Sequence, residues 1–202
     1  MAESTSLEKA SQGAARRRNA AETKAAILAS ARRLFARAGY DGAGVREIAA
    51  GAGVTAMLVN RYFGSKAQLF AAVAEDTMRD PVILSAQNMA AEDFAAALAK
   101  ALVGVTAPGA TPLDGFLILL HSASSPHAAE IGRAWIKRGH QSTLEEALSG
   151  PLPRERAGVF LALVAGMQVM RQMLEVPALA AADPADLKAV LTPVVRALVE
   201  RA

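Results

Sequence analysis

The stretch from Val45 to Lys66 constrains the fold of this chain more than any other part of the sequence. It reads VREIAAGAGVTAMLVNRYFGSK. A short amphipathic helix is predicted from Val45, followed by a tight turn at residues 51–53, where glycine can leave the right-handed region without steric cost. A second short helix is predicted from Thr55, a preferred N-cap residue, to Phe63. This pattern is typical of a helix-turn-helix, whose second helix enters the DNA major groove.

The second helix of this stretch has a predicted inner and outer face. We expect Leu58, Val59 and Phe63 to point into the protein. The other side chains should face outward and offer groups that can read a DNA groove, and these are Thr55, Ala56, Met57, Asn60, Arg61 and Tyr62.

The chemistry of this outer face suits DNA. Arg61 can pair bidentately with guanine and Asn60 with adenine, while Ala56 or Met57 can press on a thymine methyl group. Thr55 and Tyr62 suit contacts to phosphate or sugar, which fix the register of a protein on DNA without reading its sequence.

Two basic residues flank these helices as candidates for phosphate contacts. Arg46 lies in the first turn of the first helix, and Lys66 lies at the start of the helix that follows the second one. For Arg46, as for Ala56 and Met57, an ordinary surface position is an equally good interpretation.

The charge of the chain is concentrated around the predicted helix-turn-helix. Residues 16–66 carry ten basic and three acidic side chains, a net charge of +7, whereas residues 81–202 carry ten basic and eleven acidic ones. This uneven distribution indicates that the basic module binds a polyanion and that the nearly neutral module has a different function.

The composition excludes several other classes of protein. With no Cys among 202 residues, the chain has no disulfide and no thiolate metal site. The first residues lack the apolar run of a signal peptide, and no apolar stretch approaches the roughly 20 residues needed to cross a bilayer. We therefore expect a soluble, cytoplasmic protein that does not bind membranes.

Helical periodicity and breakers divide the rest of the chain. Residues 1–19 are predicted to be a disordered basic arm containing Arg16, Arg17 and Arg18. Residues 20–66 form the predicted helix-turn-helix domain, whose first helix ends at Gly39. Residues 67–202 form a second, helical domain, so the expected fold is all-α with about nine helices.

The motifs IAAGAGV at 48–54 and YFGSK at 62–66 resemble the operator-binding domain of the TetR/AcrR family of transcriptional regulators. The resemblance extends over about residues 20–74. It implies a homodimeric regulator, usually a repressor, that binds a near-palindromic DNA operator and is released by a small apolar effector. It also implies that the helices at 154–175 and 184–201 pair with those of a second copy, and the broad apolar surface of the first agrees with burial on two sides.

The resemblance further implies an effector pocket among the helices between about residues 66 and 175. Apolar and adaptable side chains in this region are candidates for its lining, with an ordinary core position as the alternative for each. These candidates are Phe94, Phe116, His121, Trp135, Met167 and Met170.

No motif points to catalysis. The three histidines, His121, His127 and His140, have no metal-binding spacing, and no phosphate-binding loop is present. We therefore expect no catalytic residues, no metal and no cofactor. A DNA-binding protein without an effector remains the alternative function, with an enzyme or a carrier of small molecules less favoured.

Overall fold

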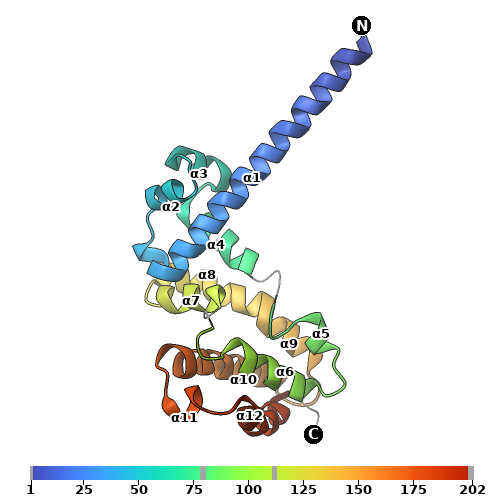
Figure 1. Ribbon diagram of the computed structural model, residues 1–202, viewed down its shortest axis with the longest axis vertical. Helices are drawn as coiled ribbons and strands as arrows, with labels where there is room; N and C mark the ends of the chain where they lie inside the picture. The colour runs from blue at the N-terminus through green and yellow to red at the C-terminus, as the bar shows by residue number, and fades with distance from the viewer. Residues whose placement is uncertain (1, 78–80, 111–112, 200–202) are drawn as a thin grey trace.

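The computed structural model describes residues 2–77, 81–110 and 113–199, with side chains from Arg18 onward. Every regular element in those ranges is a helix, which confirms the all-α prediction (Figure 1). The elements are α1 (Ala2–Gly42), α2 (Val45–Gly51), α3 (Ala56–Phe63), α4 (Lys66–Thr77), α5 (Ala86–Met89), α6 (Phe94–Val105), α7 (Asp114–Ser122), α8 (Pro126–Ile136), η1 (Lys137–Gln141), α9 (Ser142–Ala147), α10 (Pro153–Met167), η2 (Gln168–Met173), α11 (Pro177–Ala180) and α12 (Pro184–Val199).

Helix α1 begins at Ala2 rather than near Ala20, so residues 2–19 continue the helix instead of forming an irregular arm. Its first half projects away from the rest of the molecule (Figure 1). The segment is rich in Ala, Glu, Lys and Arg and lacks Pro, and these residue types favour a helix even without an apolar stripe. The side chains of Arg16 and Arg17 lie outside the described residues.

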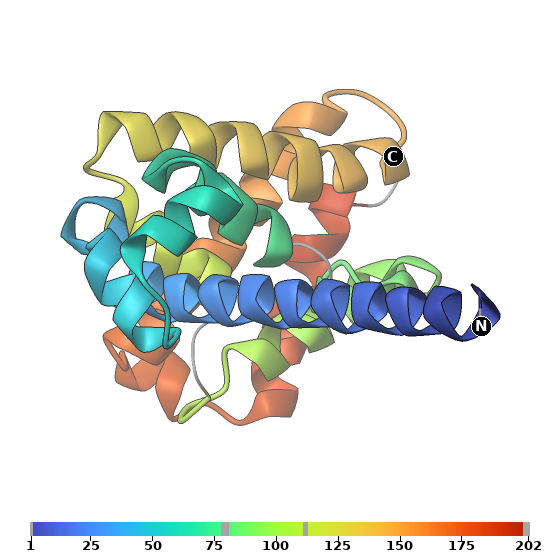
Figure 2. The same cartoon turned by 90° about the horizontal axis from the view of Figure 1, so that it is seen from above.

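Helices α1 to α4 form the head of the molecule around one apolar core. Ile27 and Phe35 of α1, Ile48 of α2 and Phe70 of α4 are buried together there. The Phe35 and Phe70 rings meet edge to face with centroids 5.0 Å apart. Helix α4 contacts α1 within the head and also α8 of the rest of the chain, between which it lies (Figure 2).

The remaining helices form the body, whose main core brings together α6, α9, α10 and α12. Leu98, Leu144, Phe160 and Val195 are fully buried at its centre. Helix α12 begins as the sequence predicts, because the Asp183 carboxylate accepts from the Ala185 N–H at 2.7 Å and Pro184 occupies the first turn. None of the described helices is long and apolar enough to cross a membrane.

Two stretches of the body are π-helical. Segment η1 joins α8 to α9 and contains Gly139. Segment η2 extends α10 and carries Arg171, which is only 1% exposed. The Arg171 guanidinium donates to the carbonyls of Leu179 and Val103 at 3.1 and 2.7 Å, which ties α10 to its neighbours.

The head and body are joined by close contacts between α1 and α7. His121 Nδ1 lies 2.6 Å from the Ala36 carbonyl oxygen, and the Tyr40 N–H donates to Ser122 Oγ at 2.9 Å. Gly39 adopts a φ of +67°, and a Cβ at that position would lie 2.1 Å from the His121 carbonyl oxygen. Only glycine allows both this backbone conformation and this approach.

Candidate nucleic-acid interface and ligand cavity

Helices α2 and α3 have the geometry that the sequence predicts for a helix-turn-helix. Gly53 in the turn has a φ of +68°, and the Leu58 N–H donates to the Thr55 hydroxyl at 3.3 Å, which makes Thr55 the N-cap of α3. Gly64, with a φ of +79°, ends α3, and Ser65 caps α4 by accepting from the Gln68 N–H at 3.2 Å. The local turn and cap chemistry thus fixes the length and position of α3.

The outer face of α3 differs in part from the prediction. Met57 is 80% exposed, and Thr55, Asn60 and Arg61 are also exposed. Ala56 and Tyr62, expected outside, are partly buried and pack against the core of the head.

Leu58, expected inside, is only half-buried and does not belong to that core. Successive residues in a helix differ by about 100° in direction, so Leu58 cannot share the inner face of Val59 and Phe63. Helical spacing alone would have placed Leu58 at the edge of the outer face, beside Met57 and Arg61.

The two flanking basic residues have different surroundings. Arg46 is exposed and makes no hydrogen bond or ion pair with the described residues. Lys66 is half-buried, with its Nζ 4.7 Å from the centroid of the Tyr40 ring and 3.5 Å from the Asp41 carbonyl oxygen. Both lie at the ends of the helix-turn-helix, Arg46 in the first turn of α2 and Lys66 in that of α4.

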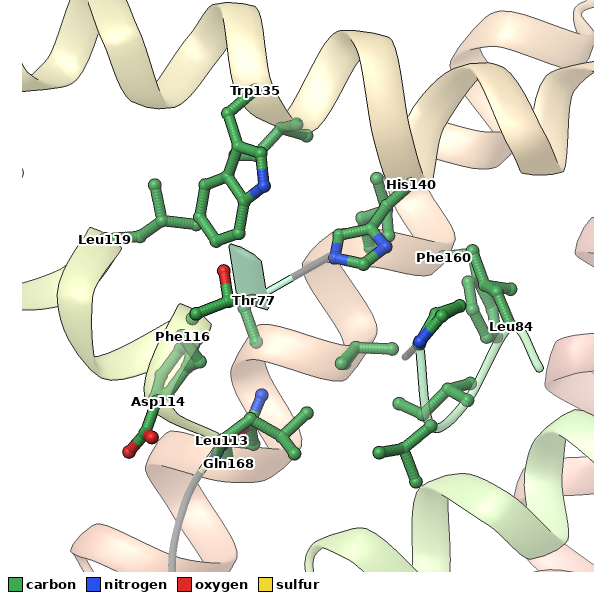
Figure 3. A pocket seen from close by; sticks show the side chains of 18 of the residues that line it. Thr77, Leu84, Leu113, Asp114, Phe116, Leu119, Trp135, His140, Phe160 and Gln168 are labelled. Atoms are coloured by element: carbon green, nitrogen blue, oxygen red, sulfur yellow. Dashed lines mark hydrogen bonds between the residues drawn. The ribbon is translucent and has the colours of Figure 1, made fainter. Parts of the chain in front are cut away.

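A cavity of about 240 Å³ lies where the head meets the body. Of the six residues predicted to line a pocket, Phe116 and Trp135 line it (Figure 3). Sequence reasoning missed the polar part of its lining, which consists of Arg32, Thr77, Asp114, His140 and Gln168.

The other four predicted residues lie outside the cavity. Phe94 and Met167 pack in the main core of the body, and His121 contacts the head through the Ala36 carbonyl. Met170 is 41% exposed on the surface of η2.

The polar groups of the cavity are partly satisfied by one another. Arg32 Nε donates to Asp114 Oδ2 at 2.6 Å, and Gln168 Oε1 accepts from the Leu113 N–H at 3.2 Å. Burial lowers the pKa of His140 below its ordinary value, which favours the neutral imidazole. The Trp135 Nε1–H is buried and has no acceptor among the described residues.

Trp135 also borders a second hollow, between α4 and α8, which includes Ala71, Ala74 and Ile131. Its indole therefore separates the cavity from a helix of the head. Exposed apolar side chains occur on α10, on η2 and the residue after it, and on α12, and we call them together the apolar face: Val159, Met170, Met173, Leu174, Val190 and Val194. The breadth of this surface matches the expectation that α10 is apolar on more than one side.

Comparison with known sequence families matches both halves of the chain. Residues 27–73 match the family described as "Bacterial regulatory proteins, tetR family". Residues 92–199 match the family described as "Tetracyclin repressor-like, C-terminal domain". Among curated protein sequences, none matches this chain significantly.

Solved structures show the same fold over most of the chain. NalD of Pseudomonas aeruginosa, the secondary repressor of the MexAB-OprM multidrug efflux pump, is 25% identical, with a TM-score of 0.57 and coverage of 89% of this chain and 98% of NalD. A TetR-family regulator from Streptomyces coelicolor A3 is 22% identical, with a TM-score of 0.57 and coverage of 88% and 94%. AibR, solved with isovaleryl coenzyme A and operator DNA, is 18% identical, with a TM-score of 0.54 and coverage of 85% and 97%. The helix-turn-helix, the helical body and both family matches lead to one conclusion: this chain is a transcriptional regulator of the TetR family.

Proposed function

We propose that this protein is a homodimeric repressor that binds a near-palindromic operator and leaves it when a small molecule enters the cavity. The observation that carries the proposal is the position of the cavity. Its lining includes Arg32 of the DNA-binding head and Asp114 of the body, which bond to each other at 2.6 Å. A ligand at this site therefore touches the contact that sets the position of the head.

In this proposal the exposed side chains of α3 read the operator. Arg61 and Asn60 contact base edges, and Met57, which is 80% exposed, presses on a thymine methyl group. Thr55 and Arg46 contact the DNA backbone.

Partly buried groups at the edge of the helix-turn-helix have a smaller role. Tyr62 and Lys66 contact phosphate or sugar at the edge of the exposed face of α3. Ala56 supports this face by packing against the core of the head.

The apolar face joins two copies of the chain. Reading two half-sites about 34 Å apart requires two heads related by a two-fold axis. The exposed Val190 and Val194 of α12 lie one helical turn apart, and Met170 of η2 and Leu174, which follows η2, are also exposed. Such a surface is stable in water when a matching surface covers it.

Ligand binding acts on the head through two contacts. A ligand in the cavity packs against the Arg32–Asp114 pair and changes its geometry, and a shift of Trp135 presses on α4 through the hollow next to Ala74. Either change favours a conformation whose heads no longer match the operator spacing, which is a shift of population between two states. NalD is a repressor, and AibR was solved with both a small molecule and operator DNA. These relatives support the proposal that this chain is a repressor controlled by a small molecule.

A binding titration tests the proposal. The purified protein is titrated onto duplex DNA from upstream of its own coding region, with excess nonspecific competitor and at several salt concentrations. We expect salt-sensitive, competitor-resistant binding that Arg61→Ala weakens and Arg133→Ala, an exposed residue of α8 in the body, does not. Absence of competitor-resistant binding by the wild-type protein contradicts the proposal.

A further inference from the structure

We propose that the cavity takes a small uncharged molecule with an apolar body and one oxygen atom that accepts a hydrogen bond from the Trp135 indole. This inference rests on the proposed function only in treating the cavity as the effector site. Three properties of the ligand are specified: its charge, its polar group and its size.

The charge of the lining excludes an ionised ligand. Arg32 and Asp114 carry the formal charges of the lining, and they neutralise each other across 2.6 Å. His140 is partly buried, and this burial lowers its pKa and favours the neutral form. A carboxylate or ammonium group entering this cavity would lose its hydration without gaining a free counter-ion, and that loss is large for a buried charge.

The polar group follows from Trp135, which is only 5% exposed and whose Nε1–H has no acceptor among the described residues. A buried donor without a partner is unfavourable, so an acceptor supplied by a ligand gains this bond without displacing another. In Figure 3 the nitrogen-bearing edge of the indole turns toward His140, and the two rings have centroids 6.1 Å apart. A hydroxyl or carbonyl oxygen between them accepts from Trp135, and a hydroxyl can also donate to the neutral imidazole.

The rest of the lining is apolar, and the cavity is small. It includes Phe116, Leu119, Phe160, Leu161 and Val164 around a volume of about 240 Å³. Since an engineered apolar cavity of about 150 Å³ holds benzene, this volume suits a molecule of about ten non-hydrogen atoms. The ligand is therefore a compact alcohol or ketone, and a coenzyme A thioester is far too large for this space.

Indane and three of its derivatives that share its bicyclic body test the inference: 1-indanol, 1-indanone and indane-1-carboxylate. Their affinities for the full-length protein are measured by calorimetry. We expect 1-indanol and 1-indanone to bind about fivefold more tightly than indane, because they gain one hydrogen bond, and we expect the carboxylate to bind least. In Trp135→Phe, which keeps an aromatic ring but removes the N–H, the preference for 1-indanol over indane should disappear.

A second measurement does not depend on the folding of that variant. Trp135 is the single tryptophan of the chain, so its fluorescence reports directly on the cavity. At equal occupancy, 1-indanol should shift the emission to longer wavelength and indane should not. The inference is overturned if no indane binds, if the carboxylate binds most tightly, or if the preference for 1-indanol persists in Trp135→Phe.

Failure of the ligand assignment can be distinguished from failure of the proposed function. A protein that binds its operator but none of the indanes remains a regulator whose ligand class is different. A protein that binds 1-indanol through Trp135 but binds no operator keeps the ligand assignment and loses the regulatory one.

Discussion

Arg32 of α1 and Asp114, the first residue of α7, form an ion pair at the cavity with 2.6 Å between Arg32 Nε and Asp114 Oδ2. Arg32 also approaches Asp76 of α4, with 3.9 Å between Arg32 Nη1 and Asp76 Oδ2. One guanidinium thus connects two helices of the head to the body. A ligand in the cavity encounters this connection directly.

Removing the negative charge of this pair should loosen the head. Asp114→Asn keeps the size of the side chain but weakens the attraction to Arg32. The side chains are 40% and 37% exposed, so the loss of stability should be modest, about 0.5–1 kcal/mol. We also expect effector to release DNA at a lower concentration. Chemical denaturation and operator titrations check this, with Glu146→Gln on the exposed side of α9 as control, and unchanged effector sensitivity would contradict the coupling.

The close approach at Gly39 should tolerate no side chain. Gly39→Ala adds a Cβ 2.1 Å from the His121 carbonyl oxygen at a φ of +67°, so the contact between α1 and α7 must open. The free energy of unfolding should fall by roughly 2 kcal/mol or more. In α6, Gly104 has open space around its Cβ position, and Gly104→Ala should raise stability by about 0.5–1 kcal/mol. Urea denaturation measures the free energy of unfolding of both variants. Equal changes in the two would contradict the tight contact between Gly39 and His121.

Acidification should destabilise the protein through His140. Burial lowers the pKa of His140 in the folded state below its ordinary value of 6.5, so the unfolded chain takes up a proton first as the pH falls. The free energy of unfolding is therefore not reduced by His140 above pH 6.5, and it declines as the pH falls through and below that value. His140→Gln should show a weaker decline in thermal-denaturation midpoint between pH 7.5 and 5. A variant with the same pH profile as the wild type would refute the role of His140.

The helix-turn-helix could be predicted from the sequence because its determinants are local. Gly53 and Gly64 adopt positive φ, and Thr55 and Ser65 cap the helices within three residues. The side-chain faces of α3 were predicted less well, because apolar character was given more weight than the step of about 100° between successive residues. Leu58 shows this, since its apolar character suggested burial and the structure leaves it half-exposed.

The cavity could not be predicted to the same degree because distant segments build it. Arg32, Asp114 and His140 come from α1, α7 and η1 and share no local pattern. His121, in contrast, lies near the C-terminal end of α7, where it contacts the head instead of the cavity. Aromatic and sulfur-containing side chains were sound candidates by type, but helix packing decides which of them reach a shared space.

Charge placed in the apolar face should separate the dimer. Val190 is 65% exposed in the single chain, so Val190→Glu should leave the fold of each copy intact. In a dimer this carboxylate would be buried without a partner, which is strongly unfavourable. We expect a monomer by sedimentation and a loss of operator affinity of at least tenfold. Glu146→Gln is again a suitable control, and a dimeric Val190→Glu protein would place the dimer interface elsewhere.

Selection of bound sites from a random duplex DNA library, with wild-type protein and with Arg61→Ala, tests whether α3 reads the operator. We expect enrichment of an inverted repeat with half-sites about 34 Å apart, and loss of preference at one symmetric pair of positions in the variant. No enriched repeat, or an Arg61→Ala protein that selects the same sequence with the same strength, would contradict the assignment of α3 as the helix that reads DNA.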